Sequence, residues 1–218
     1  MNGPETISKS ISALRIGRRG LIRTAAVGAA AAALPAKAFA AATSLTDQQR
    51  RILDLARDKI AQHGETLWRR DIAGIADFGV HSSVPRFHFA NIEAGTVKSF
   101  LVAHGTGSDP EHDGWLNDFS NVPGSNATSR GAYVTYEWYK GKYGTSIRLG
   151  GLDDDNSNAL PRYIVAHPAE YATKAHVEKW GRLGRSNGCF AMDPADFNEA
   201  LWHLSGGRLL YADKLGIG

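Results

Sequence analysis

The amino-acid sequence predicts a mainly β domain with a few peripheral helices, and two observations carry this prediction. Most of the chain from residue 72 onward consists of short apolar or alternating runs separated by turn residues, which is the pattern of β-strands. Helical spacing of apolar residues is confined to one stretch near residue 50 and to two short stretches beyond residue 168. At about 150 residues per domain, the chain of 218 residues favours one domain with a substantial core.

Residues 1–40 have the parts of an export signal. The pair Arg18-Arg19 precedes a short Ala-rich apolar run, and the small residues of Ala38-Phe39-Ala40 suit a cleavage site. The paired arginines resemble a twin-arginine signal. The alternative is a transmembrane anchor, which needs about 20 apolar residues, and this run is shorter. We therefore expect a periplasmic or otherwise exported cell-envelope protein, cleaved after Ala40 and left without a membrane span.

The positive charge of the chain belongs to that leader. The full sequence has 25 Lys and Arg against 22 Asp and Glu, a net charge of +3. Residues 1–40 contain six basic residues and one acidic residue, so the remainder has 19 against 21 and a net charge of −2. Without a basic surface, the sequence argues against a nucleic-acid partner.

Residues 41–74 are expected to form a helical segment that packs on the outside of a domain comprising 75–218. Thr46 and Gln49 have the spacing of a capping box, and Gly64 suits the C-terminal cap. Between them, apolar residues recur at helical spacing: Ile52, Leu53, Ala56 and Ile60.

The strands expected next fall into two groups. They are 72–78, 86–92 and 97–104, of which the last two form a hairpin, and then 132–139, 146–152, 162–167 and 208–212. Between the groups, residues 105–129 are rich in Gly, Ser, Asp, Asn and Pro, and long irregular segments of this kind are often functional. Helices are expected at 169–180 and from 193 or 194 to about 204, on either side of a glycine-punctuated loop.

The single cysteine, Cys189, cannot form an intramolecular disulfide, so it is either a small buried hydrophobe or a residue kept for its reactivity. Gly184 and Gly188 allow a sharp turn that presents the thiol, and backbone N–H groups around Cys189 can face a developing oxyanion. His167 ends an expected strand, and a Cys–His pair is the usual way to obtain a thiolate at neutral pH. Together these features favour a nucleophile.

Other polar and aromatic residues have two interpretations each. His104 either lines the cleft or makes a structural hydrogen bond, and Ser186 contacts either the substrate or, as we favour, its own loop. For Trp115, Trp138 and Tyr139 we expect core packing, with stacking on sugar as the alternative. The spacing of His112 with its neighbouring aspartates fits no zinc pattern, so we expect neither a metal nor another cofactor.

Several stretches, taken in order, resemble the murein L,D-transpeptidase catalytic domain family, a branch of the YkuD-like fold. They are 102–108 (VAHGTGS), 119–121 (FSN) with 124–125 (GS), 131–133 (GAY), 148–152 (RLGGL), 162–167 (RYIVAH) and 184–189 (GRSNGC). The resemblance runs from about Ile75 to the end, roughly two thirds of the chain, and its order and spacing make it specific.

This resemblance implies a mainly β, sandwich-like or barrel-like catalytic domain that transfers acyl groups between peptidoglycan stem peptides. The thiolate of Cys189 would attack the carbonyl of residue three of a tetrapeptide stem, expel D-Ala, and pass the acyl group to a neighbouring stem. His167 would be the general base, oriented by the carbonyl of Pro168. Backbone N–H groups of Gly188 and Cys189 would form the oxyanion hole.

The sequence departs from the broader family pattern at two places. An arginine often follows two places after the nucleophile, but Phe190 and Ala191 stand here, so Arg185 or Arg182 is the candidate for binding a substrate carboxylate. Asn187 occupies a place where histidine is common. Together with Arg185, we place Ser186, His104 and Asn187 among the candidate substrate-binding residues.

Three alternative functions stay open. An L,D-carboxypeptidase or crosslink hydrolase would form the same thioester and give the acyl group to water. A non-catalytic wall-binding protein would have Cys189 buried far from His167. A zinc peptidase would be inhibited by chelators. The expected partners are peptidoglycan stem peptides, and we expect a monomer.

Overall fold

The computed structural model describes residues 45–217, so the expected export signal at 1–40 lies outside the described residues. The residues from 44 to the C-terminus form one compact unit. Within the described range, no helix combines the length and apolar character that a bilayer crossing requires.

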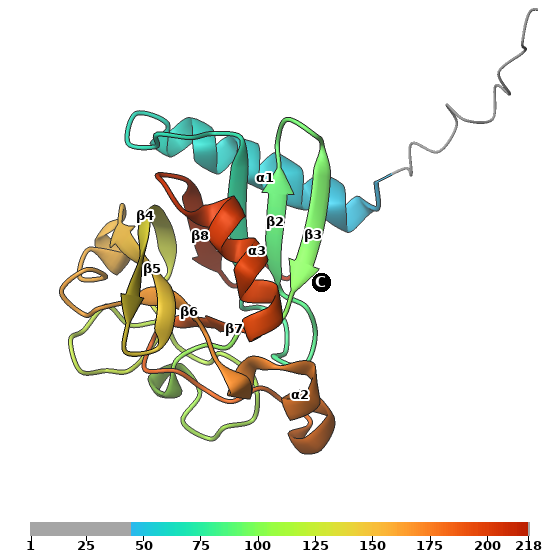
Figure 1. The fold of residues 1–218 in the computed structure, drawn as a ribbon. Helices are drawn as coiled ribbons and strands as arrows, with labels where there is room; N and C mark the ends of the chain where they lie inside the picture. The colour runs from blue at the N-terminus through green and yellow to red at the C-terminus, as the bar shows by residue number, and fades with distance from the viewer. Residues whose placement is uncertain (1–44, 218) are drawn as a thin grey trace, which may run out of the picture. The chain divides into compact units, whose positions relative to one another are not determined.

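One mixed sheet of eight strands organises the described part of the chain (Figure 1), in the spatial order β3-β2-β1-β8-β4-β5-β6-β7. Neighbouring strands are antiparallel except at two places, where β1 pairs with β8 and β6 pairs with β7 in parallel. The strands are β1 (Ile72–Asp77), β2 (Phe87–Asn91), β3 (Thr96–Phe100), β4 (Gly131–Gly141), β5 (Gly144–Gly151), β6 (Val165–Pro168), β7 (Phe190–Met192) and β8 (Leu209–Asp213).

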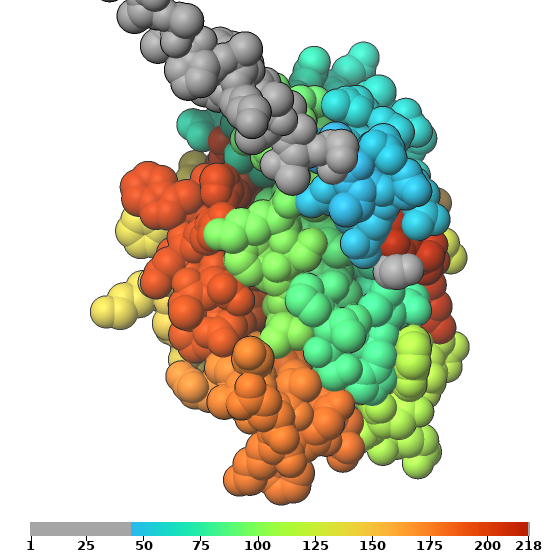
Figure 2. Space-filling model, turned by 90° about the vertical axis from the view of Figure 1, so that its right-hand side faces the viewer, coloured from blue at the N-terminus to red at the C-terminus, as the bar shows by residue number. Residues whose placement is uncertain are grey.

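Three α-helices accompany this sheet: α1 (Asp47–His63), α2 (Lys174–Trp180) and α3 (Pro194–Leu204). Short 3-10 turns lie at Thr106–Ser108, Asp154–Asn156 and Glu170–Ala172. In Figure 1, α1 (blue) crosses the top of the view and α3 (red) lies in front of the sheet. Figure 2 shows the segment that contains α2 (orange) protruding from the lower end of the molecule. The predicted mainly β fold with peripheral helices is confirmed.

The sheet is covered on both faces because its central strands are apolar at successive positions. In β8, Leu209 and Tyr211 join the core under α1, whereas Leu210 and Ala212 join the core under α3. This is the alternation that a strand imposes on its side chains. The α1 side is completed by the helical residues Ile52, Leu53, Ala56 and Ile60, and the α3 side by Phe197, Ala200 and Leu204.

The helix expected over 169–180 is divided in two. A 3-10 turn, Glu170–Ala172, precedes α2, and Thr173 between them is extended, with φ −90° and ψ 158°. The Thr173 hydroxyl accepts the backbone N–H of His176, so this residue caps a new helix instead of continuing an old one. Apolar spacing alone does not reveal such an internal N-cap.

Candidate active site

The segment that ends β6 and the loop that leads into β7 bring together the two residues expected to do chemistry. β6 and β7 are parallel, with Ala166 opposite Phe190 and His167 opposite Ala191. Ala166 and Phe190 enter the core under α3, so the alternation of side chains directs His167 and Ala191 to the other face. Cys189 directly precedes Phe190 and therefore shares the face of His167.

Cys189 and His167 line the same cavity, whose volume is about 170 Å³. The cavity walls also contain three of the expected substrate-binding residues, together with two tyrosines that the sequence did not single out. The full lining is Tyr143, His167, Tyr171, Arg185, Ser186, Asn187 and Cys189.

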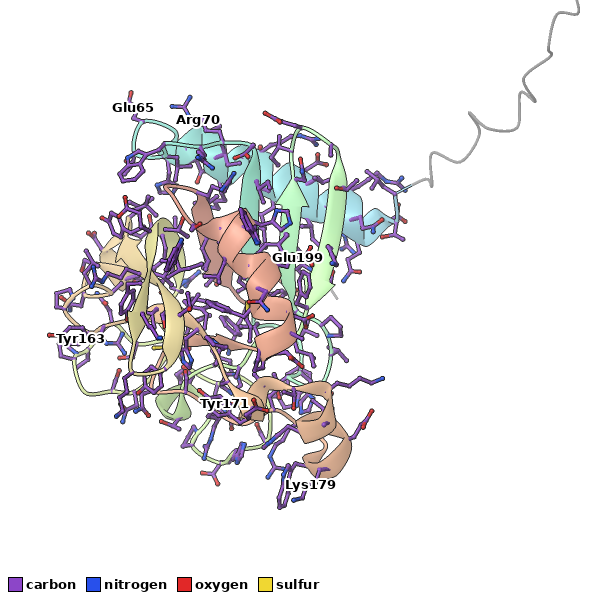
Figure 3. The ribbon with its side chains drawn as sticks, in the orientation of Figure 1. Glu65, Arg70, Tyr163, Tyr171, Lys179 and Glu199 are labelled. Carbon is purple, nitrogen blue, oxygen red and sulfur yellow. The ribbon has the colours of Figure 1, made fainter. Side chains whose placement is uncertain are left out.

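The thiol of Cys189 is nearly enclosed, since only 7% of the residue is exposed. It donates a long hydrogen bond of 3.7 Å to the carbonyl oxygen of Tyr163. Tyr163 has a positive φ of 56°, and its side chain, 83% exposed, points away from the molecule (Figure 3). Burial raises the pKa of the Cys189 thiol, while a backbone hydrogen bond from Val165 and the charge of Arg162 oppose this rise.

His167 is 2% exposed, and its orientation is set by its own strand. Its Nδ1 lies 2.9 Å from the carbonyl oxygen of Pro168. A carbonyl oxygen can only accept, so Nδ1 carries the proton and Nε2 of the neutral ring is left as an acceptor. Burial lowers the pKa of His167, and the hydrogen bond to Pro168 works against this. The ring is therefore neutral at pH 7.

Ser186 holds the backbone of the loop around Cys189. Its hydroxyl donates to the Cys189 carbonyl oxygen at 2.6 Å and accepts the Gly188 N–H at 3.1 Å. Gly188 has φ +106°, and an added Cβ would lie 2.7 Å from the Ala127 carbonyl oxygen, so only glycine fits here. Of the two N–H groups expected to form the oxyanion hole, that of Gly188 is thus engaged within the loop.

The His-Gly segment around residue 104 lies alongside this loop. The Ser186 N–H donates to the His104 carbonyl oxygen at 2.8 Å, and the Thr106 N–H donates to the Ser186 carbonyl oxygen at 2.8 Å. Two motifs that are about 80 residues apart in the sequence are thereby joined by backbone hydrogen bonds.

The His104 side chain, however, points away from the cavity and is 1% exposed. Its Nδ1 lies 2.8 Å from a guanidinium nitrogen of Arg86, and its Nε2 lies 3.1 Å from a carboxylate oxygen of Asp109. Since a guanidinium can only donate, Nδ1 accepts and Nε2 carries the proton. Burial, reinforced by the charge of Arg86, lowers the pKa of His104 to about 3. The structure thus places it in the interior, apart from the other three substrate-binding candidates.

Arg185 reaches the cavity wall from the same loop. Its guanidinium donates to the carbonyl oxygen of Asp109 and, at 3.2 Å, to that of Pro110. Both acceptors are neutral carbonyl groups, so its positive charge is held in place without a carboxylate to neutralise it there. Arg182, the other arginine considered for this task, is not among the residues that line the cavity.

Two lining residues were missed by sequence reasoning. Tyr143 lies in the turn between β4 and β5, and its ring stacks on the imidazole of His167. Tyr171 lies in the turn before α2 (Figure 3), and its carbonyl oxygen accepts the Gly184 N–H at 2.8 Å. A hairpin turn flanked by Gly141 and Gly144 is readable from the sequence, but the direction in which the hairpin bends is not.

The aspartates near His112 are used inside the protein. The Asp109 carboxylate accepts from His104 and from the N–H groups of Asp113 and Gly114, and His112 contacts the Leu183 carbonyl oxygen at 3.1 Å. Among residues 45–217, no group of three or more His, Cys, Asp and Glu side chains is arranged to hold a metal ion.

The expectation that the large aromatic residues pack in the core was wrong for two of them. Trp115 is 47% exposed and Trp138 is 60% exposed. Trp138 lies beyond an irregularity in β4 that changes which face its side chain meets, and alternation read from the sequence cannot anticipate it. Tyr139 is half-buried, and its ring faces the guanidinium of Arg148.

The sequence and the structure of this chain were compared with those of known proteins. No curated protein matches the sequence. Solved structures that match include an L,D-transpeptidase from Mycobacterium smegmatis, at 13% identity over 66% of this chain and 58% of that one, with a TM-score of 0.40. An L,D-transpeptidase from Mycobacterium tuberculosis matches at 15% identity over 66% of this chain and 57% of that one, with a TM-score of 0.39.

A third match is the helical cell shape determining protein Pgp2 from Campylobacter jejuni, at 12% identity over 76% of this chain and 55% of that one, with a TM-score of 0.41. The chain therefore spans less than two thirds of the length of each of these proteins. Residues 46–212, most of the chain, match the L,D-transpeptidase catalytic domain family. The protein belongs to the L,D-transpeptidase catalytic domain family.

Proposed function

We propose that this protein is a peptidoglycan L,D-transpeptidase of the cell envelope, with Cys189 as nucleophile and His167 as general base. One observation carries the assignment of residues. Cys189 and His167 line one small cavity, and the Pro168 carbonyl oxygen leaves the Nε2 atom of His167 free to accept a proton. Membership of the family supplies the reaction class.

In the first step the Cys189 sulfur attacks the carbonyl carbon of residue three of a tetrapeptide stem. The thiol proton passes to Nε2 of His167, and the carbonyl oxygen becomes an oxyanion. The tetrahedral intermediate collapses to a thioester, and the bond to the terminal D-Ala breaks. The imidazolium returns its proton to the departing D-Ala amine, so that His167 is neutral again.

Burial of Cys189 and His167 determines at which stage of the reaction the thiol proton is transferred. It raises the pKa of Cys189 and lowers that of His167, so the resting pair is a neutral thiol and a neutral imidazole. Proton transfer then accompanies attack on the substrate instead of preceding it. The same burial protects the thiol from reagents when no substrate is bound.

In the second step the side-chain amine of a neighbouring stem attacks the thioester carbonyl. His167 Nε2 accepts a proton from that amine, and Cys189 leaves as a thiol once the proton is returned to sulfur. The product is a crosslink at residue three. If water takes the place of the amine, the outcome is a shortened stem.

In this mechanism the oxyanion accepts a hydrogen bond from the backbone N–H of Cys189. It accepts a second one from the N–H of Gly188 when that group leaves the Ser186 hydroxyl. Arg185 offers an anchored positive charge on the cavity wall for the substrate carboxylate. Asn187 is on the same wall and offers its side-chain amide to the peptide backbone, whereas Ser186 acts by holding the loop around Cys189. No cofactor takes part in these steps.

The test is mass spectrometry of the purified protein after incubation with disaccharide-tetrapeptide fragments, beside Cys189→Ala and His167→Gln variants. Dimers linked through residue three, made by the wild type alone, support the proposal. Shortened monomers without dimers would show the same thioester chemistry with water as acceptor. If the wild type leaves fragments intact that a known L,D-transpeptidase consumes, the proposed function is overturned.

A further inference from the structure

A second hollow lies between the β4–β5 hairpin and α3, apart from the cavity that contains Cys189. Its volume is about 460 Å³, which is within the usual range for small-ligand sites. We name it the tryptophan groove after its two tryptophans. Its lining residues are Arg69, Trp138, Thr145, Leu201, Trp202 and Ser205. In Figure 1 the hairpin (yellow) and α3 (red) that form its walls are neighbours.

Both indoles of this groove are exposed to solvent. Trp138 is 60% exposed and Trp202 is 83% exposed, although α3 buries Phe197 and Leu204 on its opposite side. These two large aromatic side chains line the same hollow, and their apolar surface stays exposed to water. Single exposed apolar residues need no explanation, but a pair that shares a groove indicates a binding surface.

An irregularity in β4 directs Trp138 into the groove. Thr135 lies opposite Leu149, but Trp138 lies opposite Ile147, so β4 has one more residue than β5 between these pairs. Directly opposed residues of antiparallel strands point to the same face. Ile147 and Leu149 both face the core under α3, and Trp138 therefore faces the α3 side.

Without the extra residue, Trp138 would point to the opposite face, and Glu137 would lie beside α3. The turn that follows α3 holds the bulged segment in place. Gly207 donates its N–H to the Thr135 carbonyl oxygen at 2.7 Å, and Gly206 donates to that of Tyr136 at 3.2 Å. This β-bulge changes the face to which Trp138 points, and hydrogen bonds from the turn after α3 stabilise it. It is therefore a specific feature of the sheet and not a local defect.

The chemistry of the groove suits a ligand with flat apolar faces and many hydroxyl groups. Indole rings stack against such faces, as they do against other flat groups. Around them, the Thr145 hydroxyl and the Arg69 guanidinium offer hydrogen bonds, and the described lining contains no carboxylate. A sugar chain has these properties. Nucleobases also stack, but the net charge of −2 beyond residue 40 disfavours a polyanion.

The hairpin connects the groove to the candidate active site. Trp138 and Thr145 lie on its two strands, and Tyr143, which lines the Cys189 cavity, lies at its tip. At about 3.3 Å per residue, the five residues from Trp138 to Tyr143 span at most roughly 17 Å. Three extended residues of a stem peptide reach roughly 10 Å, which is shorter than this limit. Trp138 also faces the α3 side of the sheet, whereas Cys189 and His167 face the opposite side, so the groove and the cavity bind separate parts of a polymer.

We propose that the tryptophan groove binds the glycan strand of peptidoglycan and so holds the protein beside the stem peptides that reach the cavity at Cys189. This inference deepens the proposed function and rests on it for peptidoglycan as the polymer that the protein contacts. Binding of the glycan itself does not depend on catalysis, so the two can be tested separately.

The binding test uses glycan strands from which all stem peptides have been removed, and measures co-sedimentation of the full-length protein. Trp202→Ala and the double variant with Trp138→Ala are compared with Trp180→Ala, which removes an equally large exposed indole from α2. We expect at least about tenfold weaker binding for the groove variants and no change for the control. Equal binding by all variants, or no binding by the wild type, overturns the inference.

The activity test separates this inference from the proposed function. Free tetrapeptide and intact peptidoglycan are supplied to the wild type and to Trp202→Ala. We expect Trp202→Ala to consume free tetrapeptide at the wild-type rate and intact peptidoglycan with a raised apparent KM. Loss of both activities by Trp202→Ala, at an unchanged unfolding midpoint, contradicts a role limited to glycan.

Two further outcomes are informative. If the wild type consumes neither substrate while Trp202-dependent binding to glycan persists, the proposed function fails and the groove assignment stands. If Trp202→Ala instead converts a dimer to a monomer in size-exclusion chromatography and leaves glycan binding intact, the groove is an interface between copies of the chain and the inference is wrong.

Discussion

Tyr143 lies over the imidazole of His167, with ring centroids 4.7 Å apart and ring planes inclined by 24°. The stack covers one face of the candidate general base and restricts its rotation, in addition to the hydrogen bond with Pro168. Tyr143 is itself 46% exposed and belongs to the tip of the β4–β5 hairpin. The solvent exposure of His167 therefore depends on the position of a surface hairpin.

Replacing Tyr143 with alanine is expected to move the acid limb of the pH–rate profile upward. Burial is what lowers the pKa of His167, so exposing the ring brings its pKa back toward the ordinary 6.5. Protonated His167 cannot accept the thiol proton, and activity falls below this pKa. The measurement is kcat/KM against pH for the wild type, Tyr143→Ala and Tyr143→Phe.

The phenylalanine variant is the matched control, because it keeps the stacked ring and loses only the hydroxyl. Its acid limb should coincide with that of the wild type. An alanine variant whose acid limb also coincides with the wild type would show that the stack does not set the protonation of His167.

Replacing Ser186 with alanine is expected to lower both kcat and the free energy of unfolding. The change removes the donor to the Cys189 carbonyl oxygen and the acceptor of the Gly188 N–H. The free energy of unfolding should fall by about 1–3 kcal/mol, the usual effect of leaving buried polar groups unpaired. Because the loop no longer fixes the nucleophile, kcat should fall at least about tenfold.

Urea denaturation and steady-state kinetics measure these two quantities on the same preparation. Ser157→Ala is a suitable control, since this hydroxyl also donates to a backbone carbonyl, that of Asp154, but lies outside both the cavity and the tryptophan groove. A Ser186→Ala enzyme with wild-type kcat would refute the role given to this loop.

Replacing Arg86 with methionine is expected to destabilise the protein strongly. The guanidinium is fully buried and donates to the carbonyl oxygens of Val102 and Val80 and to Nδ1 of His104. Burial lowers its pKa to about 9, so it stays charged at neutral pH. Removing one member of a buried charged network costs about 3–5 kcal/mol.

Arg86→Lys tests whether charge alone suffices. A lysine keeps the charge but has no planar fork, so it cannot reach all three acceptors, and we expect an intermediate loss of stability. Equilibrium denaturation of both variants gives the comparison. A methionine variant as stable as the wild type would mean that the buried network contributes nothing to the fold.

Acid should destabilise the fold before its carboxylates titrate. Burial lowers the pKa of His88 to about 4 and that of His104 to about 3, whereas both have a pKa near 6.5 in the unfolded chain. Between pH 6.5 and 4 the unfolded state therefore binds more protons, and stability falls as the pH falls. Each histidine contributes a slope of at most about 1.4 kcal/mol per pH unit.

The free energy of unfolding, measured from pH 7.5 to 4.5, checks this dependence. His88→Gln should reduce the slope because it removes one of the two groups, while His203→Gln on the half-exposed side of α3 serves as the control. A flat profile for the wild type over this range would contradict the assignment of two neutral buried histidines.

Sequence reasoning predicted the strands and the helix ends where local chemistry determines them. The capping box of Thr46 and Gln49 is present at the start of α1, and α3 begins with Pro194 after the Asp193 cap. The hairpin between β2 and β3 was also predicted. These features depend on residues a few positions apart, so a single sequence contains the information they need.

The features that were missed depend on contacts between distant segments. The stacking of Tyr143 on His167 requires the hairpin to bend over β6, and the exposure of Trp138 requires an extra residue in β4. Likewise, His104 has one partner from before β2 and one from the irregular segment that follows it. No local pattern of residue types specifies such pairings.

The place of β8 in the sheet has a consequence for synthesis. Residues 209–213 lie between β1 and β4, so the last of these eight strands in chain order joins the two halves of the sheet. While the ribosome still holds this strand, the β3-β2-β1 group and the β4-β5-β6-β7 group have no shared partner. Until then, the nascent chain has two sheet edges without a neighbouring strand. Complete, cooperative folding of the sheet therefore begins only after these five residues have been synthesised.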